Sequence, residues 1–188
     1  MAAAPEHGAT ATRQPLDLWT FLVEVYKLPE VAPACLRLQE AFQLDVVLFL
    51  AVLYAAGRGR HVDAEAIAAL EAGAVQWRDE VVRPLRLVRS RMKAHPWMAR
   101  PDAPPFREAV KALELRAERI EAVALEEALA DLPESDAARM NLAGTIEPAG
   151  LLVLDHAAGP GASIARRADV SRIAQAAATL LREPGGPA

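Results

Sequence analysis

The 188-residue sequence is poor in the residues that build disulfide frameworks, metal centres and aromatic binding surfaces. Its one cysteine, Cys35, excludes an internal disulfide and a multi-cysteine zinc site. Aromatic residues make up only 5% of the chain. No two of the four histidines are three or four residues apart, as two metal ligands on one helix face would be: His7, His61, His95 and His156. We therefore expect neither a metal site nor a cofactor.

The usual sequence signatures of nucleophiles and phosphate-binding loops are also missing. No serine lies in a GxSxG motif, and Cys35 lies among apolar residues, where the pKa of a thiol rises and the thiol is unreactive. The Gly-Arg-Gly-Arg-His segment at 57–61 offers backbone amides and cations to an anion, but it matches neither GxGxxG nor GxxxxGK[ST]. The alternative is that this segment is only a turn that ends a helix, with its arginines in solvent. The sequence thus predicts no catalytic residue.

Net charge and hydropathy indicate which cellular compartment and which kinds of partner we expect for this protein. The formal net charge of −4 does not favour binding to nucleic acid or to an anionic membrane. The unbroken apolar run at 46–56 is shorter than the about 20 residues that a membrane-spanning helix needs. Residues 1–14 lack the apolar segment of a signal peptide. These features predict a cytoplasmic protein.

The chain is rich in alanine, leucine and valine, with 53% hydrophobic residues in all, and its patterns are helical. We predict an all-α fold: a single-domain helical bundle of about six helices at 15–132, after a disordered tail at 1–14. Helices are expected at 16–27, 33–42, 46–56, 64–72, 74–95 and 105–131. Asp45 and Asp63 are the predicted caps of two of them, and the apolar run at 46–56 is the predicted buried central helix. Residues 133–188 are expected to form a C-terminal appendage, either mobile or docked, in which Gly144, Pro148 and Gly150 interrupt regular structure before one more helix at about 169–181.

Two segments carry long amphipathic stripes. Within 74–95, Pro84 interrupts a stripe that keeps its phase, which favours a kinked helix over two separate ones. That stripe consists of Trp77, Val81, Leu85, Val88 and Met92. In the long helix at 105–131 a second stripe has spacings of four and three: Phe106, Val110, Leu113, Ala117, Ile120 and Ala124. Both stripes are predicted to face the core.

A basic helix face and a tryptophan after it form the candidate interaction surface: Arg83, Arg86, Arg89, Lys93 and Trp97. Such a face fits an acidic protein partner better than nucleic acid, because no aromatic side chains alternate with the cations to stack on bases. The alternative is that the cations pair within the chain with acids of the long helix. Those acids are Glu108, Glu114, Glu118 and Glu121.

Polar residues near the predicted core form a candidate pocket: Asp45, Arg37, Gln39, Tyr26 and Tyr54. Asp45 has two interpretations. It caps the central helix at the surface, or it is a buried carboxylate that needs a cationic partner such as Arg37 or Arg83.

Several segments in order resemble a known family: Leu18-Trp19, Val25-Tyr26, Cys35-Leu36-Arg37-Leu38-Gln39, Asp45-Val46 and, most specifically, the segment from Trp77 to Arg86. The last contains the motif Trp-Arg-x-x-Val-Val-x-Pro-Leu-Arg. Together they are similar to a family of small, bacterial, all-helical proteins catalogued as a domain of unknown function. The resemblance covers 16–132. At Val47 this chain departs from the asparagine usual in the family. The resemblance implies the fold but no activity.

Two functions follow from the sequence. The first is a non-catalytic helical module for protein–protein interaction, assembly or regulation. Homo-oligomerisation through the long helix is compatible with the sequence, but the sequence does not itself predict it. The alternative is a small-molecule-binding protein, or an uncharacterised enzyme, with a pocket between helices near Asp45.

Overall fold

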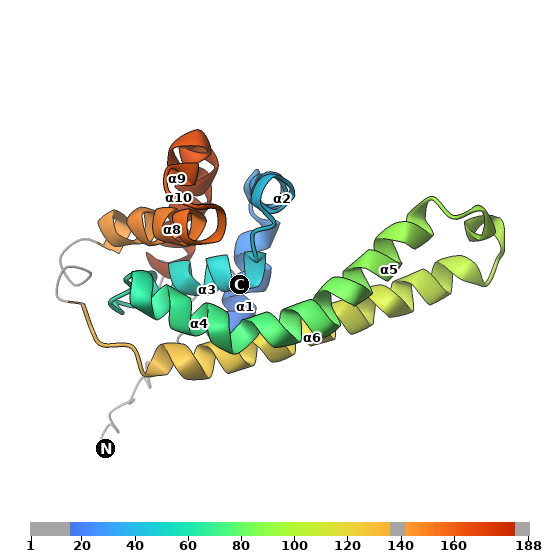
Figure 1. The fold of residues 1–188 in the computed structure, drawn as a ribbon, viewed down its shortest axis with the longest axis horizontal. Coiled ribbons are helices and arrows are strands. Elements are labelled where there is room, and N and C mark those ends of the chain that lie inside the picture. Colours follow the sequence, from blue (N-terminus) through green and yellow to red (C-terminus); the bar gives the residue numbers. More distant parts are fainter. Residues whose placement is uncertain (1–15, 136–141, 183–188) are drawn as a thin grey trace, which may run out of the picture.

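The computed structural model describes residues 16–135 and 142–182, and the regular structure within these ranges is helical, as Figure 1 shows. The predicted all-α fold is therefore confirmed. The predicted tail at 1–14 lies outside the described residues. No helix in the described part of the chain combines the length and the apolarity that crossing a membrane requires.

The centre of the fold is α3 (Val46–Gly57), in which ten of the 12 residues are buried. Because every side chain in this helix before its glycine is apolar or aromatic, neighbours can pack against all of its faces. The surrounding helices are α1 (Leu18–Lys27), α2 (Val31–Phe42), α4 (Ala64–Trp77), the second half of α6 (Ala103–Ala130), α8 (Leu142–Ala158) and α10 (Arg167–Arg182). The apolar run is thus the buried central helix that the sequence predicted.

The C-terminal helices dock on this centre, with α8 lying along α3 and α10 lying against α8 and α2. The helix expected at 169–181 is α10, and a short helix, α9 (Ala162–Ala165), precedes it. The expected interruption by Gly144, Pro148 and Gly150 is wrong, because α8 runs through all three. Gly150 permits this packing, since a β-carbon there would lie 2.9 Å from Val170 and 3.0 Å from Leu53. Whether 133–188 is a separate unit stays a prediction.

The segment from 64 to 93 is one continuous helical path and not two helices divided at Gly73. Between α4 and α5 (Arg83–Lys93) lies one wide π-helical turn, η1 (Arg78–Val82), in which the Arg83 amide donates to the Arg78 carbonyl. Pro84 follows directly after this turn, and because it has no N–H it leaves one main-chain hydrogen bond of the continuous helix unmade there. The distortion predicted within this helix is therefore a π-helical turn, which lies just before Pro84.

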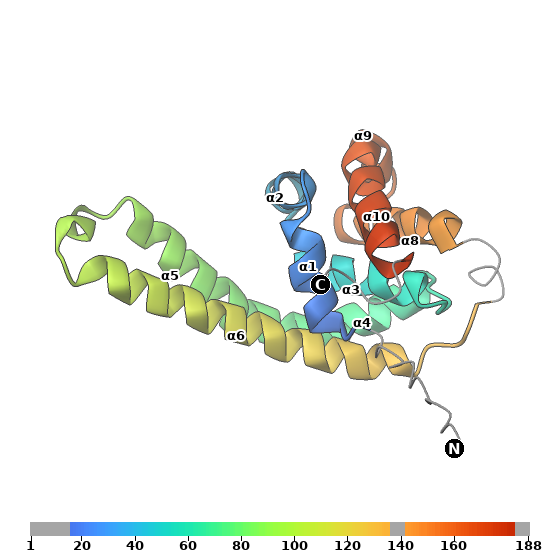
Figure 2. The ribbon, with the colours of Figure 1, turned by 180° about the vertical axis from the view of Figure 1, so that it is seen from behind.

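Beyond this turn the chain leaves the body as a helical hairpin. Helix α5, the 3₁₀ turn η2 (Pro96–Ala99) and the first part of α6 project away from the other helices in both views (Figures 1 and 2). We call residues 83–118 the arm. No residue of α5 is buried. The predicted burial of the stripe on this helix is therefore wrong, and Val88 is 48% exposed.

Candidate functional site

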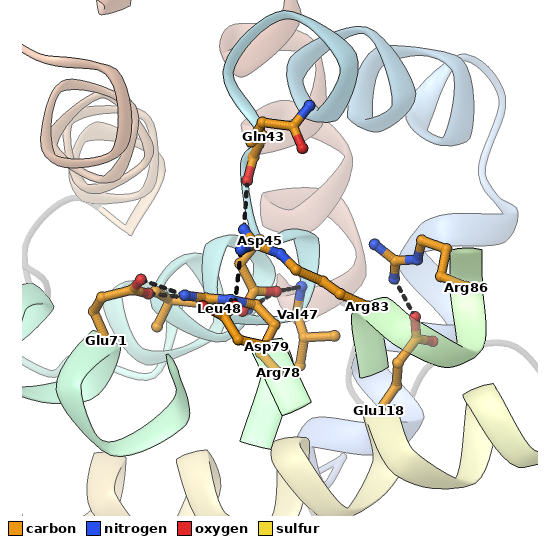
Figure 3. A network of polar contacts seen from close by, with 10 residues as sticks. All are labelled: Gln43, Asp45, Val47, Leu48, Glu71, Arg78, Asp79, Arg83, Arg86 and Glu118. Atoms are coloured by element: carbon orange, nitrogen blue, oxygen red, sulfur yellow. Dashed lines mark hydrogen bonds and ion pairs between the residues drawn. The ribbon is translucent and has the colours of Figure 1, made fainter. Parts of the chain in front are cut away.

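A cavity of about 520 Å³ lies where the arm joins the body. Its walls come from the end of α2, the start of α3, the π-helical turn, α5 and α6. Figure 3 shows the polar contacts beside it, which form two groups: one around Arg78 and one between Arg86 and Glu118.

Asp45 is both a helix cap and a buried ionic partner. One carboxylate oxygen accepts hydrogen bonds from the amides of Val47 and Leu48, at 2.9 and 3.3 Å. The other accepts from the guanidinium of Arg78 at 2.9 Å. The side chains of Asp45 and Arg78 are 8% and 7% exposed. Asp45 therefore caps α3 as one interpretation predicted, but it is buried and not at the surface, and its partner is Arg78 and not Arg37 or Arg83.

Arg78 lies at the centre of the network (Figure 3). Besides Asp45, it donates to both carboxylate oxygens of Glu71, at 2.5 and 2.8 Å. The hydrogen bonds with Glu71, and then those with Asp45, raise the pKa of the guanidinium against the opposing effect of burial. Arg78 thus holds the start of α3 and the end of α4 together as a permanent buried cation.

Glu121 is the unusual residue of the site. It comes from α6, lines the cavity and is 2% exposed. Neither of its carboxyl oxygens has a hydrogen-bond donor among the described residues. Burial, followed by the nearby negative charge of Asp45, raises the pKa of Glu121 to about 9. Near neutral pH Glu121 is therefore a protonated, neutral acid.

A second ionic cluster joins the two helices of the arm. Arg86 donates to Glu114 at 3.0 Å and to Glu118 at 2.5 Å, and Arg89 donates to Glu114. Burial opposes the ionisation of Glu114, but the hydrogen bonds from Arg89 and Arg86 outweigh it and lower its pKa. Burial has the larger effect on Glu118 and raises its pKa. The alternative that the basic face pairs within the chain thus holds for Arg86 and Arg89.

The other candidates on the predicted interaction surface have different environments. Arg83 forms an ion pair with Asp79 at 2.8 Å, and both side chains are 44% exposed. Lys93 is exposed at the end of α5. Trp97 is 69% exposed at the tip of the arm. The Arg100 guanidinium lies 5.9 Å from the centre of its ring. The basic face is therefore not one open cationic surface.

The predicted pocket residues do not all converge on Asp45. Gln39 lines the same cavity, and Tyr26 lines a neighbouring hollow of about 470 Å³ between α1, α2 and the arm. Arg37 instead pairs with Asp169 of α10 at 2.7 Å, and Tyr54 donates to the Leu16 carbonyl at 2.7 Å. Cys35 is buried, which raises the pKa of its thiol to about 12. It is packed in the core, as its apolar neighbours predicted.

Exposed apolar side chains are concentrated on the arm and along α6. Of the thirteen large apolar residues that are exposed in the described part of the chain, eight lie on α5, η2 and α6: Leu87, Val88, Trp97, Phe106, Leu113, Leu115, Ile120 and Val123. Four of them share one face of α6, and we call them the α6 stripe: Phe106, Leu113, Ile120 and Val123. Of the six residues in the predicted seam of the long helix, only two are therefore buried. Val110 and Ala117 are buried, whereas Phe106, Leu113 and Ile120 are 61%, 51% and 53% exposed.

Sequence reasoning missed Arg78 and Glu71, and it treated Glu121 only as a possible ion-pair partner. A signal for Glu121 exists, because Glu114 and Glu121 are in helical phase with the buried Val110 and Ala117. Arg78 offers no such signal, since its partner Asp45 is 33 residues away in the sequence.

Comparison with known proteins places this geometry in a family. The family model DUF2390, described as a protein of unknown function, matches residues 17–125. Since this is more than half of the chain, the protein belongs to that family, and the predicted resemblance is confirmed. The match contains Asp45, Arg78 and Glu121 but ends before α8. No curated protein and no solved structure matches the chain.

Proposed function

We propose that this DUF2390 protein is a helical assembly module and that its long helix α6 pairs with α6 of a second copy of the chain. The observation that carries the proposal is the α6 stripe. Three of its members, Phe106, Leu113 and Ile120, recur every seven residues and are all more than half exposed. A seven-residue apolar repeat is the pattern by which two helices pack side by side.

No segment among residues 16–135 and 142–182 covers the stripe, since its members stay exposed. Helix α6 has 28 residues and is about 42 Å long at roughly 1.5 Å per residue. It buries a different row of side chains against α5 and the body, which includes Val110, Ala117 and Leu125. Fully burying a valine, leucine or isoleucine side chain stabilises a protein by about 1.5–3 kcal/mol, so covering the half-exposed Leu113, Ile120 and Val123 is worth a few kcal/mol before the cost of association.

Charge complementarity favours a second copy as the partner. Arg116 and Glu127 lie on the same side of α6 as the stripe, and neither has an ion-pair partner among the described residues. In an antiparallel pair with its two-fold axis between residues 121 and 122, Ile120 faces Val123 of the other copy and Leu113 faces its Ala130. Phe106 lies beyond the paired segment, because α6 of the other copy ends at Ala130. In the same arrangement Arg116 faces Glu127 of the other copy. A two-fold pair of this kind is the commonest form of homo-oligomer.

An acidic partner for the basic face is supported less well. Arg86 and Arg89 are held by Glu114 and Glu118 inside the arm, so an outside acid must compete with these bonds. We therefore propose protein–protein interaction as the function, with the α6 stripe and not the basic face as the interaction surface. We also place the protein in the bacterial cytoplasm, where its single cysteine suits a reducing compartment.

The test is the molar mass of the full chain in solution, measured by sedimentation equilibrium over a concentration series. We expect a dimer with a Kd of about 10 µM or tighter, and a monomer for the double variant L113E/I120E, because the substitutions put four carboxylates into the paired stripe. The matched control is Ile164→Glu, which places a carboxylate at an apolar residue that is 82% exposed on α9. It should stay dimeric.

A charge exchange tests the register. Arg116→Glu should weaken the dimer several-fold, and adding Glu127→Arg should restore it, because the pair is rebuilt with its signs reversed. A wild-type chain that is monomeric at about 1 mM, or a double variant that dimerises as strongly as the wild type, contradicts the proposal.

A further inference from the structure

We propose that the cavity at the base of the arm binds an organic cation, specifically a primary amine with an aliphatic chain, and that Glu121 holds its ammonium group. This site is separate from the α6 stripe, and it goes beyond assembly as a function.

The first support is the position of Glu121. This side chain is 98% removed from solvent, it lines the cavity, and no described residue donates a hydrogen bond to either of its oxygens. A buried carboxyl group without a hydrogen-bond partner destabilises a fold, and the large majority of buried side-chain polar atoms in proteins have a partner. A ligand with several N–H donors would supply what the chain does not.

The second support is the pairing of charges around the cavity. Three carboxyl groups line it, Asp45, Asp79 and Glu121, and so do three guanidinium groups, Arg78, Arg83 and Arg86. Each of these guanidinium groups already has a carboxylate partner, so none is free to hold an anion. Glu121 is the lining acid whose oxygens have no partner among the described residues.

The donor set distinguishes between kinds of cation. In residues 16–135 and 142–182, no three histidine, cysteine, aspartate or glutamate side chains come together closely enough to hold a metal ion. The two oxygens of Glu121, with the negative charge of Asp45 nearby, suit an ammonium group. Its three N–H donors can be shared among neighbouring oxygens.

The remaining wall of the cavity fits the rest of such a ligand. Its apolar part comes from the start of α3, the π-helical turn and α5: Leu44, Val47, Val82, Pro84 and Leu87. The volume of about 520 Å³ lies within the range of small-molecule sites, which are mostly apolar with a few polar anchors. An aliphatic chain attached to the ammonium group would cover this wall.

Binding of the amine should release a proton. Burial and the charge of Asp45 raise the pKa of Glu121, while Arg78 lowers it and Glu118 raises it slightly. An ammonium ion beside Glu121 favours the ionised form, so below pH 9 the proton leaves as the ligand enters. An alkylammonium ion itself stays charged in this range, with a pKa of about 10.5 like that of lysine.

The test is isothermal titration calorimetry of the full chain with n-hexylammonium chloride as the probe, near pH 7, in two buffers of different ionisation enthalpy. We expect binding, release of about one proton, and affinity at least about tenfold weaker for 1-hexanol, which has the same chain without the charge. Glu121→Gln should reduce amine affinity about tenfold or more. The matched control Glu108→Gln removes a carboxylate that is 61% exposed on the same helix and should bind like the wild type.

The pH dependence of the wild type gives a readout that needs no variant. Between about pH 6 and pH 8 the association constant should rise about tenfold per pH unit, because one proton is released per amine bound. The proposal is overturned by the absence of binding at millimolar amine, by equal affinity for hexanol, or by an affinity that does not change with pH. Equal affinity in a folded Glu121→Gln variant overturns it as well.

Discussion

The body and the arm of this protein are built on different forces. In the body, ten of the 12 residues of α3 are buried, and its largest fully buried side chains, Phe49, Leu50 and Leu53, are at most 1% exposed. In the arm, α5 has no buried residue and is tied to α6 by Arg86, Arg89 and their carboxylate partners. Apolar burial stabilises the body, and charge-assisted hydrogen bonds align the arm.

The difference shows how a helix can be ordered without a core of its own. The cluster around Glu114 is partly buried, so its hydrogen bonds are stronger than those of an open surface pair. Each half of the arm still leaves apolar side chains in solvent, including Leu87 and Leu113. The arm therefore has a fixed direction but an uncovered surface, which is what an assembly element requires.

The largest expected effect comes from matched truncations in the two regions. Phe49→Ala removes a side chain that is 0% exposed and should lower the free energy of unfolding by about 4 kcal/mol, from lost burial and the cavity left behind. Leu87→Ala removes one that is 49% exposed on the arm and should cost less than about 1 kcal/mol. Urea denaturation followed by circular dichroism measures both. Similar losses would mean that the arm has an apolar core of its own.

The next effect lies at the junction of the two regions and depends on pH. The folded-state pKa of Glu121 is raised to about 9, from an ordinary value near 4.3 in the unfolded chain. Between these values the unfolded state binds fewer protons than the folded state, so this group makes stability fall as pH rises. Glu121→Gln should remove that fall, and we expect its stability advantage over the wild type to grow by up to about 1 kcal/mol per pH unit from pH 5 to pH 8.

Denaturation curves at several pH values measure this difference. Glu108→Gln is the control, since that side chain is solvated and should leave the pH profile of the wild type unchanged. A difference between the Glu121→Gln variant and the wild type that stays constant with pH would show that Glu121 is ionised in the folded protein.

The two regions also differ in how far the sequence predicts them. The apolar run of α3 needs no partner to be recognised as buried, and the caps at Asp45 and Asp63 follow from local chemistry. In α6 the pattern finds the helix and its apolar rows, but periodicity cannot say which row meets the body. The row that contains Val110 packs inward and the row that contains Leu113 does not, because tertiary packing decides between them.

The residues of the site also differ in how far the sequence predicts them. Asp45 stands out because a carboxylate directly precedes an apolar helix, whereas its pairing with Arg78 depends on how α4 crosses the start of α3. The path through Gly73 was missed because a glycine inside a helix costs only about 1 kcal/mol relative to alanine. The neighbours packed against α4 offset that cost, and no single-residue preference contains this information.

The smallest expected effect separates local order in the arm from global stability. Glu114→Gln removes the charge that accepts hydrogen bonds from Arg86 and Arg89, so the two helices of the arm should part more often. Amide hydrogen exchange, read by mass spectrometry, should become about three- to tenfold faster in α5 and stay unchanged in α3, because α3 opens only with the body.

The effect of Glu114 also depends on pH, because its pKa is lowered in the folded protein. Its stabilising contribution to the arm is complete above the ordinary glutamate pKa and is lost as pH falls through the lower folded-state value. The difference in α5 exchange between this variant and the wild type should therefore shrink in acid. Equal acceleration in α3 and α5 would show that arm and body unfold as one unit and that the charge cluster stabilises both.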